Sequence, residues 1–242
     1  MSVEKRLEYD FVVVGGGLAG VGAALSAARK GVKTALVQDR SVLGGNSSRE
    51  IRVAPAGAGA YHAWATETGI ISELLDTDRA VNHQALSNGR MNSVYDQVLF
   101  DACRTQANLD LYLNTVVFGT QMRDAASIES LSAKQLGTEE QYRFCAPLFS
   151  DCTGDGAVAA LAGCESMIAD KLMGSSILFT AIDTGKEAPF TPPEWSHLYA
   201  DEESLVFRHP DNFESGYYWI EIGWPYDTIS ENEQIRDTLL AH

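Results

Sequence analysis

The sequence predicts an α/β fold built on a mainly parallel sheet, and the first forty residues carry the main observations. Residues 9–14 form a short β-rich run, a helical pattern begins at Leu18, and residues 33–38 form a second β-rich run. Two buried strands joined by one helix are typical of a parallel βαβ unit. Hydrophobic residues make up 45% of the 242 residues, so the chain has enough apolar side chains for a substantial core.

The segment GGGLAG lies between the first strand and the helix and fits the pattern G-x-G-x-x-G. Gly15 permits the tight strand-to-helix turn, Gly17 lets the backbone approach a pyrophosphate, and Gly20 lets the helix pack close to the strands. The amino end of the helix offers N–H groups and the positive end of the helix dipole to phosphates. Because the motif lies inside a βαβ unit of the right length, the sequence predicts a Rossmann-like dinucleotide site.

The ribose position, at the end of the second strand, reads Gln38, Asp39 and Arg40. Gln38 occupies the position where an acidic residue is expected, and its amide oxygen can accept a hydrogen bond from a ribose hydroxyl. Asp39 offers a carboxylate, although adjacent strand residues face opposite ways unless a turn begins there. Arg40 can lie over the adenosine or contact a phosphate, and it keeps NADP open as a ligand.

Two further segments favour FAD over NAD. The segment LGGNSS, residues 43–48, directly follows the second strand and supplies a second turn of small residues for an extended dinucleotide. The segment DCTGDG, residues 151–156, ends an apolar strand and again places small residues at its carboxyl end. Ligands of open α/β sheets bind at the carboxyl ends of strands. The three segments together predict one long ligand that carries two phosphates.

These segments resemble the FAD-dependent oxidoreductases of the glutathione-reductase-like fold, which has two dinucleotide motifs. The resemblance is closer to the branch with V-x-D-R-x-x-L-G-G-N-x-S-x-E-I-R and D-A-T-G-D-G, which here read VQDRSVLGGNSSREIR and DCTGDG. The resemblance covers nearly the whole chain. Cys152 replaces the usual alanine, and the stretch 164–171 is shorter than the resemblance leads us to expect.

The resemblance implies FAD contacts along the three turns and one strand. The pyrophosphate would lie along the first turn, and the residues that follow the second strand would surround the adenosine. The second turn would run beside the pyrophosphate and the isoalloxazine ring, and the third turn would close the nucleotide site. No metal site is expected. The expected cofactor-binding residues are Gly15, Gly17, Leu18, Ala19, Gly20, Gln38, Asp39, Arg40, Gly44, Gly45, Asn46, Ser47, Ser48, Val117, Thr153, Gly154 and Asp155.

The middle of the chain predicts a helix that the capping box Ser93-x-x-Asp96 opens, followed by strands over 109–118, 128–136 and 141–147. In the fold that the resemblance implies, such strands form a small antiparallel crossover sheet next to the parallel sheet. We therefore expect an FAD-binding domain over residues 1–165.

Residues 166–242 are expected to be part of a substrate or cap domain. A second capping box, Ser230-x-x-Glu233, predicts a helix near the end of the chain. Flavoproteins of this fold usually return to the flavin with a glycine-rich turn near their carboxyl terminus. The chain ends at His242 without such a segment, so we expect a C-terminally truncated protein.

The expected activity is hydride transfer from a small-molecule substrate to the flavin. His62 is the candidate base for a substrate proton, and Arg52 is the candidate contact for an anionic substrate or for the O2 side of the flavin. Disulfide reductases need a cysteine pair where Ser47 and Ser48 stand, so that chemistry is excluded. An NAD(P)-dependent dehydrogenase and a non-catalytic flavin-binding fragment remain as alternatives.

The net charge and the cysteine content indicate which classes of partner and which cellular compartment to expect. The formal net charge is −15, from 33 acidic and 18 basic residues, which disfavours nucleic acid and anionic membranes as partners. No signal peptide and no run of membrane-spanning length is visible. The four cysteines form no C-x-x-C pair, so we expect reduced thiols in a cytoplasmic protein.

Overall fold

The computed structural model describes residues 4–51, 53, 55, 69–81, 95–167, 174–180, 185–187, 189–200, 217–222, 226–228 and 230–242. The chain divides into two compact units, Met1–Ser166 and Met167–His242.

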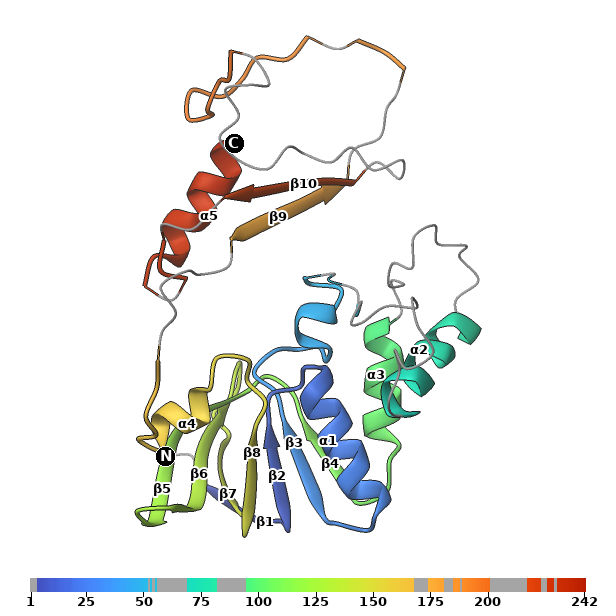
Figure 1. Ribbon diagram of the computed structural model, residues 1–242, viewed down its shortest axis with the longest axis vertical. Helices are drawn as coiled ribbons and strands as arrows, with labels where there is room; N and C mark the ends of the chain where they lie inside the picture. The colour runs from blue at the N-terminus through green and yellow to red at the C-terminus, as the bar shows by residue number, and fades with distance from the viewer. Residues whose placement is uncertain are drawn as a thin grey trace. The chain divides into compact units, whose positions relative to one another are not determined.

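A four-stranded parallel sheet forms the centre of the first unit, as predicted (Figure 1). Its strands lie in the order β4-β3-β2-β8, so the first strand of the βαβ unit occupies an inner position. Val14 pairs with Val37 on one side and with Asp151 on the other, so three strands end at the same edge of the sheet. The strands are β2 (Phe11–Val14), β3 (Thr34–Val37), β4 (Leu109–Tyr112) and β8 (Leu148–Asp151).

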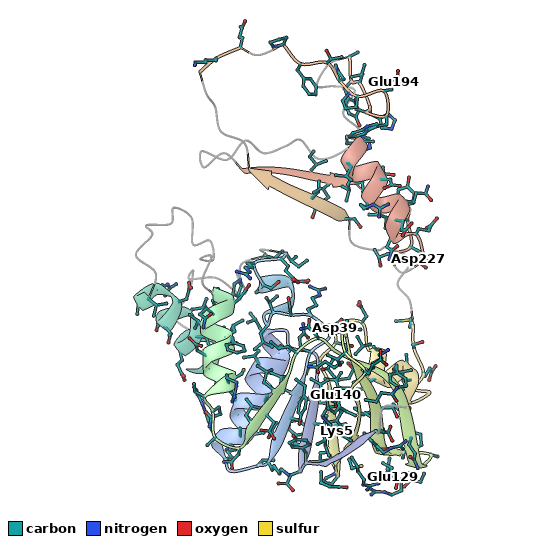
Figure 2. The ribbon with its side chains drawn as sticks, turned by 180° about the vertical axis from the view of Figure 1, so that it is seen from behind. Lys5, Asp39, Glu129, Glu140, Glu194 and Asp227 are labelled. Carbon is teal, nitrogen blue, oxygen red and sulfur yellow. The ribbon has the colours of Figure 1, made fainter. Side chains whose placement is uncertain are left out.

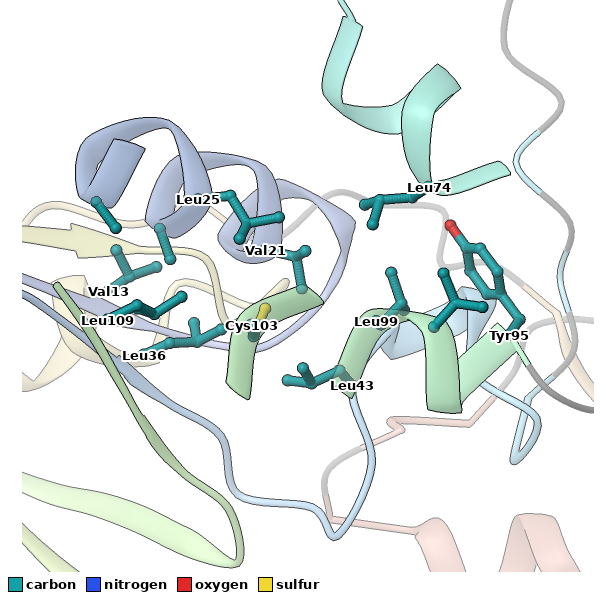
Figure 3. Close-up of a cluster of buried hydrophobic side chains, with 13 residues drawn as sticks. Val13, Val21, Leu25, Leu36, Leu43, Leu74, Tyr95, Leu99, Cys103 and Leu109 are labelled. Atoms are coloured by element: carbon teal, nitrogen blue, oxygen red, sulfur yellow. The ribbon is translucent and has the colours of Figure 1, made fainter. Parts of the chain in front are cut away.

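Two helices, α1 and α3, pack on one face of the parallel sheet and α2 packs on these helices, whereas the crossover sheet covers the other face. Alternation along the strands separates the two faces, because successive side chains of a strand point to opposite sides. Val13 and Leu36 are buried against the helices, whereas Val12, Val14 and Ala35 are buried against the crossover sheet. Figure 3 shows the helix side of this core. The helices are α1 (Leu18–Arg29), α2 (Gly69–Val81) and α3 (Tyr95–Arg104).

The crossover sheet has the order β1-β7-β6-β5 and is antiparallel from β5 to β7, as predicted. The strand β1, which pairs in parallel with β7, was not predicted, because its residues KRLE show no apolar pattern. Lys5 forms an ion pair with Glu140 at 2.5 Å, which joins the amino-terminal ends of the two strands (Figure 2). The strands are β1 (Lys5–Glu8), β5 (Thr115–Asp124), β6 (Ser127–Gln135) and β7 (Gln141–Cys145).

The single strand predicted over residues 109–118 is wrong, because β4 and β5 belong to different sheets. Asn114 lies between them with a φ of 52°, a left-handed conformation that Asn tolerates better than most residues. Its N–H donates to the Arg40 carbonyl at 3.0 Å, and its own carbonyl accepts the Leu136 N–H at 2.6 Å. These bonds fix the corner at which the chain passes from one sheet to the other.

The second unit contains the antiparallel pair β9 (Ser175–Thr180) and β10 (Tyr217–Ile222), followed by α5 (Asn232–Ala241). Ile222, Ile235 and Leu239 form its buried cluster. The capping box predicted at Ser230 is wrong. Glu231 is the N-cap residue of α5, and its carboxylate accepts the Asp227 N–H at 2.7 Å.

The short helix α4 (Ala157–Leu161) follows β8 in the first unit. Among the helices of the described residues, none is both long enough and apolar enough to cross a membrane.

Candidate functional site

The first glycine turn lies at the carboxyl end of β2, and its backbone packs too closely for a side chain. A Cβ on Gly15 would lie 2.2 Å from the Cys152 carbonyl oxygen, and the φ of Gly15 is +102°. A Cβ on Gly20 would lie 1.8 Å from the Gly15 carbonyl oxygen. Both values are far below any real carbon contact, so α1 can sit this close to the strands only because glycine occupies both positions.

The amino end of α1 opens toward free space. A Cβ on Gly17 would have a single neighbour within 4 Å, the Cα of Gly45 at 3.9 Å. Gly17 is the N-cap residue, and in the described part of the chain no side chain caps this end and no acidic residue lies in its first turn. The first N–H groups of a helix have no partner within the helix, so the amides at Leu18 and Ala19 suit a phosphate.

The second glycine turn lies directly against the first. The Gly44 N–H donates to the Gly16 carbonyl at 2.8 Å, and a Cβ on Gly45 would lie 3.0 Å from the Gly17 Cα. Gly44 and Gly45 both have positive φ, 109° and 57°, and a single 3₁₀ turn, η1 (Gly45–Ser47), follows. The backbones of the two turns therefore run side by side.

The polar residues of the second turn differ in exposure. Asn46 is exposed, whereas Ser47 and Ser48 are buried. The Ser48 hydroxyl has no hydrogen-bond partner among the described residues. A buried hydroxyl without a partner is costly, so a ligand group or a water is expected to reach it.

The third turn follows β8 and is held by its own polar side chains. The Asp151 carboxylate accepts hydrogen bonds from the Thr153 N–H at 3.0 Å, the Thr153 hydroxyl at 2.7 Å and the Ala159 N–H at 2.9 Å. The Thr153 hydroxyl in turn accepts the Ala157 N–H at 2.9 Å. Gly154 has a φ of +91°, and both Gly154 and Asp155 are exposed.

The hydrogen bonds to Asp151 also determine its ionisation. Burial alone would raise the pKa of this carboxyl group, but the bonds from Thr153 and from the backbone of Ala159 outweigh that effect. The pKa therefore lies below its ordinary value of 3.8. Asp151 is ionised at neutral pH, when all of its hydrogen bonds to the turn are present.

At the ribose position, the Gln38 side chain forms hydrogen bonds within the protein. Its side chain is only 4% exposed, and its amide oxygen accepts the Gly16 N–H at 2.6 Å. Its amide nitrogen donates to the Val42 carbonyl at 3.3 Å. Gln38 therefore links the first turn to the residues that lead into the second turn.

Asp39 and Arg40 are both exposed, and Asp39 lies just beyond the carboxyl end of β3 (Figure 2). The Arg40 side chain comes within 3.9 Å of the Glu50 carboxylate. The predicted contact Val117 is half-buried on β5 in the crossover sheet. The Thr115 N–H donates to the Gln38 carbonyl at 2.8 Å, which fixes the start of β5 at the ribose position.

The structure thus brings the three predicted turns together, with the first turn between the other two. His62 and Arg52, the predicted catalytic residues, lie outside the described residues. Sequence reasoning missed Asp96 of α3, whose carboxylate accepts the Arg49 N–H at 2.9 Å. Asp96 was predicted as part of a helix cap, and no local pattern connects it to a turn so far away along the chain.

Comparison with known proteins adds the family. A family model described as FAD dependent oxidoreductase matches residues 10–233. The alpha-glycerophosphate oxidase of Streptococcus pneumoniae serotype 4 is 29% identical over 118 residues, which are 46% of this chain and 19% of that protein. The aerobic glycerol-3-phosphate dehydrogenase of Staphylococcus aureus strain USA300 is 44% identical over 58 residues, which are 23% of this chain and 10% of that protein.

A likeness to a solved structure supports the fold. The geranylgeranyl bacteriochlorophyll reductase-like protein of Thermoplasma acidophilum matches with a TM-score of 0.54 and 17% identity, over 97% of this chain and 61% of that chain. This likeness agrees with the predicted α/β fold. The matched segments span less than a fifth of the two curated relatives named above.

Proposed function

Because the chain belongs to the FAD dependent oxidoreductase family, we propose that it oxidises a small organic molecule by hydride transfer to the flavin. The family membership confirms FAD as the predicted cofactor, in place of NAD(P). FAD supplies the hydride-accepting ring when it is bound. The residues of this chain bind the cofactor and orient it.

The observation that supports the proposal is the packing of three glycine-containing turns at the strand ends. The closest approaches are those of Gly15 to Cys152 and of Gly45 to Gly17. Such turns leave backbone N–H groups beside a helix end, which is the environment that a pyrophosphate requires. We propose that the amides at Leu18 and Ala19 hold the pyrophosphate.

The remaining predicted contacts are divided between the ends of the cofactor. Since the Gln38 oxygen already accepts the Gly16 N–H, we propose that the exposed Asp39 carboxylate binds the ribose. Arg40 and Val117 would lie beside the adenosine. The second turn, with Gly44, Gly45, Asn46, Ser47 and Ser48, would run beside the pyrophosphate and the isoalloxazine ring. The third turn, with Thr153, Gly154 and Asp155, would close the nucleotide site.

The substrate is proposed from the relatives and from the chemistry. The two curated relatives named above are a glycerophosphate oxidase and a glycerol-3-phosphate dehydrogenase, so a phosphorylated alcohol is the first substrate class to test. His62 remains the proposed base for the substrate hydroxyl proton, and Arg52 the proposed contact for an anionic group. We also propose a cytoplasmic location, with no nucleic-acid or membrane partner, and a substrate or cap domain over residues 166–242.

The test begins with the colour of the purified chain. We expect bound flavin with an absorption band at about 450 nm, which is the property of the cofactor itself. Under anaerobic conditions, a panel of phosphorylated alcohols, free alcohols and amines is then added, and bleaching of the band identifies the donor. Gly45→Val is the matched control, because its side chain would meet Gly17 and block the site.

Two results would contradict the proposal in different ways. A colourless chain that takes up no FAD in a titration would refute the cofactor site. A yellow chain that dithionite bleaches, but no organic donor does, would favour the non-catalytic flavin-binding alternative.

A further inference from the structure

A buried carboxylate on α3 holds the end of the second glycine turn from behind. Asp96 lies in the first turn of α3 and is only 7% exposed. One of its oxygens accepts the Arg49 N–H at 2.9 Å, and the other lies 3.1 Å from the Arg49 Nε. Both oxygens therefore contact the residue that directly follows Ser48.

A second residue of α3 contacts the opposite end of the same turn. The Leu99 side chain lies one helical turn beyond Asp96, and its Cδ1 would be 3.2 Å from a Cβ on Gly44. Leu43, just before the turn, is buried in the same cluster as Leu99 (Figure 3). The helix α3 is therefore the surface against which the second turn is shaped, with a polar contact at one end and an apolar contact at the other.

The polar contact has the properties of a fixed anchor. Among the described residues, Asp96 Oδ1 accepts the Arg49 N–H, whereas Oδ2 has no hydrogen-bond partner and only faces the Arg49 guanidinium in the ion pair. A buried carboxylate needs such partners, so the position of Asp96 depends on that of Arg49. Hydrogen bonds to an ionised group are shorter and stronger than neutral ones. The amino end of α3 also favours a negative charge in its first turn.

The backbone of the second turn connects the anchor to the first turn. This segment runs from Gly45 to Arg49, and Gly45 packs on Gly17 at the amino end of α1. A displacement of the Arg49 end would therefore move the backbone that faces the proposed cofactor.

From these contacts we infer that Asp96 is a positioning residue for FAD, because it fixes the second glycine turn through the Arg49 backbone and guanidinium. The inference rests on the proposed function, since FAD is the ligand that the turn would face. Asp96 does not itself reach the cofactor. Its effect is on the shape of the turn before the ligand arrives.

The test compares FAD affinity in three variants of the full chain. Asp96→Ala removes both contacts, and we expect the Kd for FAD to rise about tenfold or more. Asp96→Asn keeps an acceptor for the Arg49 N–H but loses the charge, and we expect a rise of about threefold. Asp101→Ala is the matched control, because Asp101 is an exposed carboxylate on the same helix, and its Kd should not change.

A measurement without FAD separates positioning from loss of folding. Circular dichroism should show that the Asp96→Ala chain is folded at the temperature of the titration. Hydrogen exchange of the amides in residues 44–49 should be faster in this variant than in the wild type, while exchange in β2 and β3 stays the same. A role limited to folding would instead speed exchange in all of these elements together.

The outcomes are distinct. If Asp96→Ala is folded and binds FAD as tightly as the wild type, the inference is refuted and the proposed function stands. If Asp96→Ala does not fold, Asp96→Asn and Arg49→Gln decide the question, and wild-type affinity in both would refute the inference. A wild-type chain that binds no FAD would refute the proposed function itself.

Discussion

The first and third glycine turns serve the same end of the sheet but are shaped in different ways. In the first turn, a Cβ on Gly15 or Gly20 would overlap backbone atoms at 2.2 Å or 1.8 Å. In the third turn, a Cβ on Gly154 or Gly156 would meet no atom within 4 Å. The first turn is therefore defined by close packing, whereas the third is defined by positive φ and by hydrogen bonds to Asp151. A glycine in such a motif can be required because a side chain would overlap its neighbours, or because the backbone adopts a positive φ.

The largest effect on stability is expected in the first glycine turn, which is defined by close packing. Gly20→Ala should lower the free energy of unfolding by about 3 kcal/mol, because the new methyl group must displace the Gly15 carbonyl. Thermal and urea unfolding of the apoprotein measure this change. Gly22→Ala on the same helix is the control, since no atom lies within 4 Å of its Cβ position. Alanine should raise helix stability there by about 0.5–1 kcal/mol, so a loss at Gly22 would contradict the contact argument.

The next effect concerns Gln38, a buried side chain that links the first turn to the residues leading into the second turn. Gln38→Leu should lower the free energy of unfolding by about 2 kcal/mol, because the buried Gly16 N–H loses its acceptor. Gln38→Glu keeps an acceptor oxygen and should lower the free energy of unfolding by a smaller amount. Urea unfolding at neutral pH gives the comparison. Equal stability of Gln38→Leu and the wild type would mean that Gly16 finds another acceptor.

In the third turn we expect a smaller effect that depends on pH. Asp151→Ala should lower the free energy of unfolding by about 1 kcal/mol at pH 7, because the carboxylate is exposed and solvent weakens its bonds. Burial opposes ionisation of Asp151, but its hydrogen bonds outweigh burial and lower its folded-state pKa below 3.8. Its stabilisation is therefore present above pH 3.8 and is lost as the pH falls through the lowered pKa.

The check for Asp151 is the difference between variant and wild type as a function of pH. This difference should shrink as the pH is lowered below 3.8. A difference that stays constant with pH would contradict the assigned role of the ionised carboxylate.

The smallest effect on stability is expected at Gly154, where a Cβ would meet no atom within 4 Å. Gly154→Ala must place a side chain at a φ of +91°, which costs about 1 kcal/mol of backbone strain but causes no overlap. The unfolding temperature of the apoprotein should therefore fall by only about 2–4 °C. Gly154→Asn should cost less, because Asn tolerates left-handed backbone better. A loss as large as that of Gly20→Ala would erase the contrast between the two turns.

The sequence was sufficient for features that are contiguous along the chain. The three glycine turns and the parallel strands beside them were predicted, because period and glycine spacing are local signals. The strand β1 was missed because a charged edge strand lacks the apolar pattern. The corner at Asn114 was missed because Leu-Tyr-Leu-Asn-Thr-Val-Val reads as one strand, and only the tertiary bonds of Asn114 reveal the break.

Contacts between distant segments were outside the reach of local patterns. The pair of Asp96 and Arg49 joins a helix to a turn, and neither residue type indicates the other. Gln38 shows a related limit. Its position was identified, but whether its amide oxygen faces a ligand or the Gly16 N–H depends on the three-dimensional approach of the two segments.

The place of β8 in the sheet has a consequence for synthesis on the ribosome. β2 pairs with β8, and Phe11 is paired with Leu148, so one edge of β2 stays uncovered until the chain has been synthesised as far as β8. Until then, a growing chain can assemble β2, β3 and β4 but leaves an apolar strand edge open, which is a hazard for association between nascent chains. The third turn is also the last to be made, so a cofactor can be enclosed only after the crossover sheet has emerged.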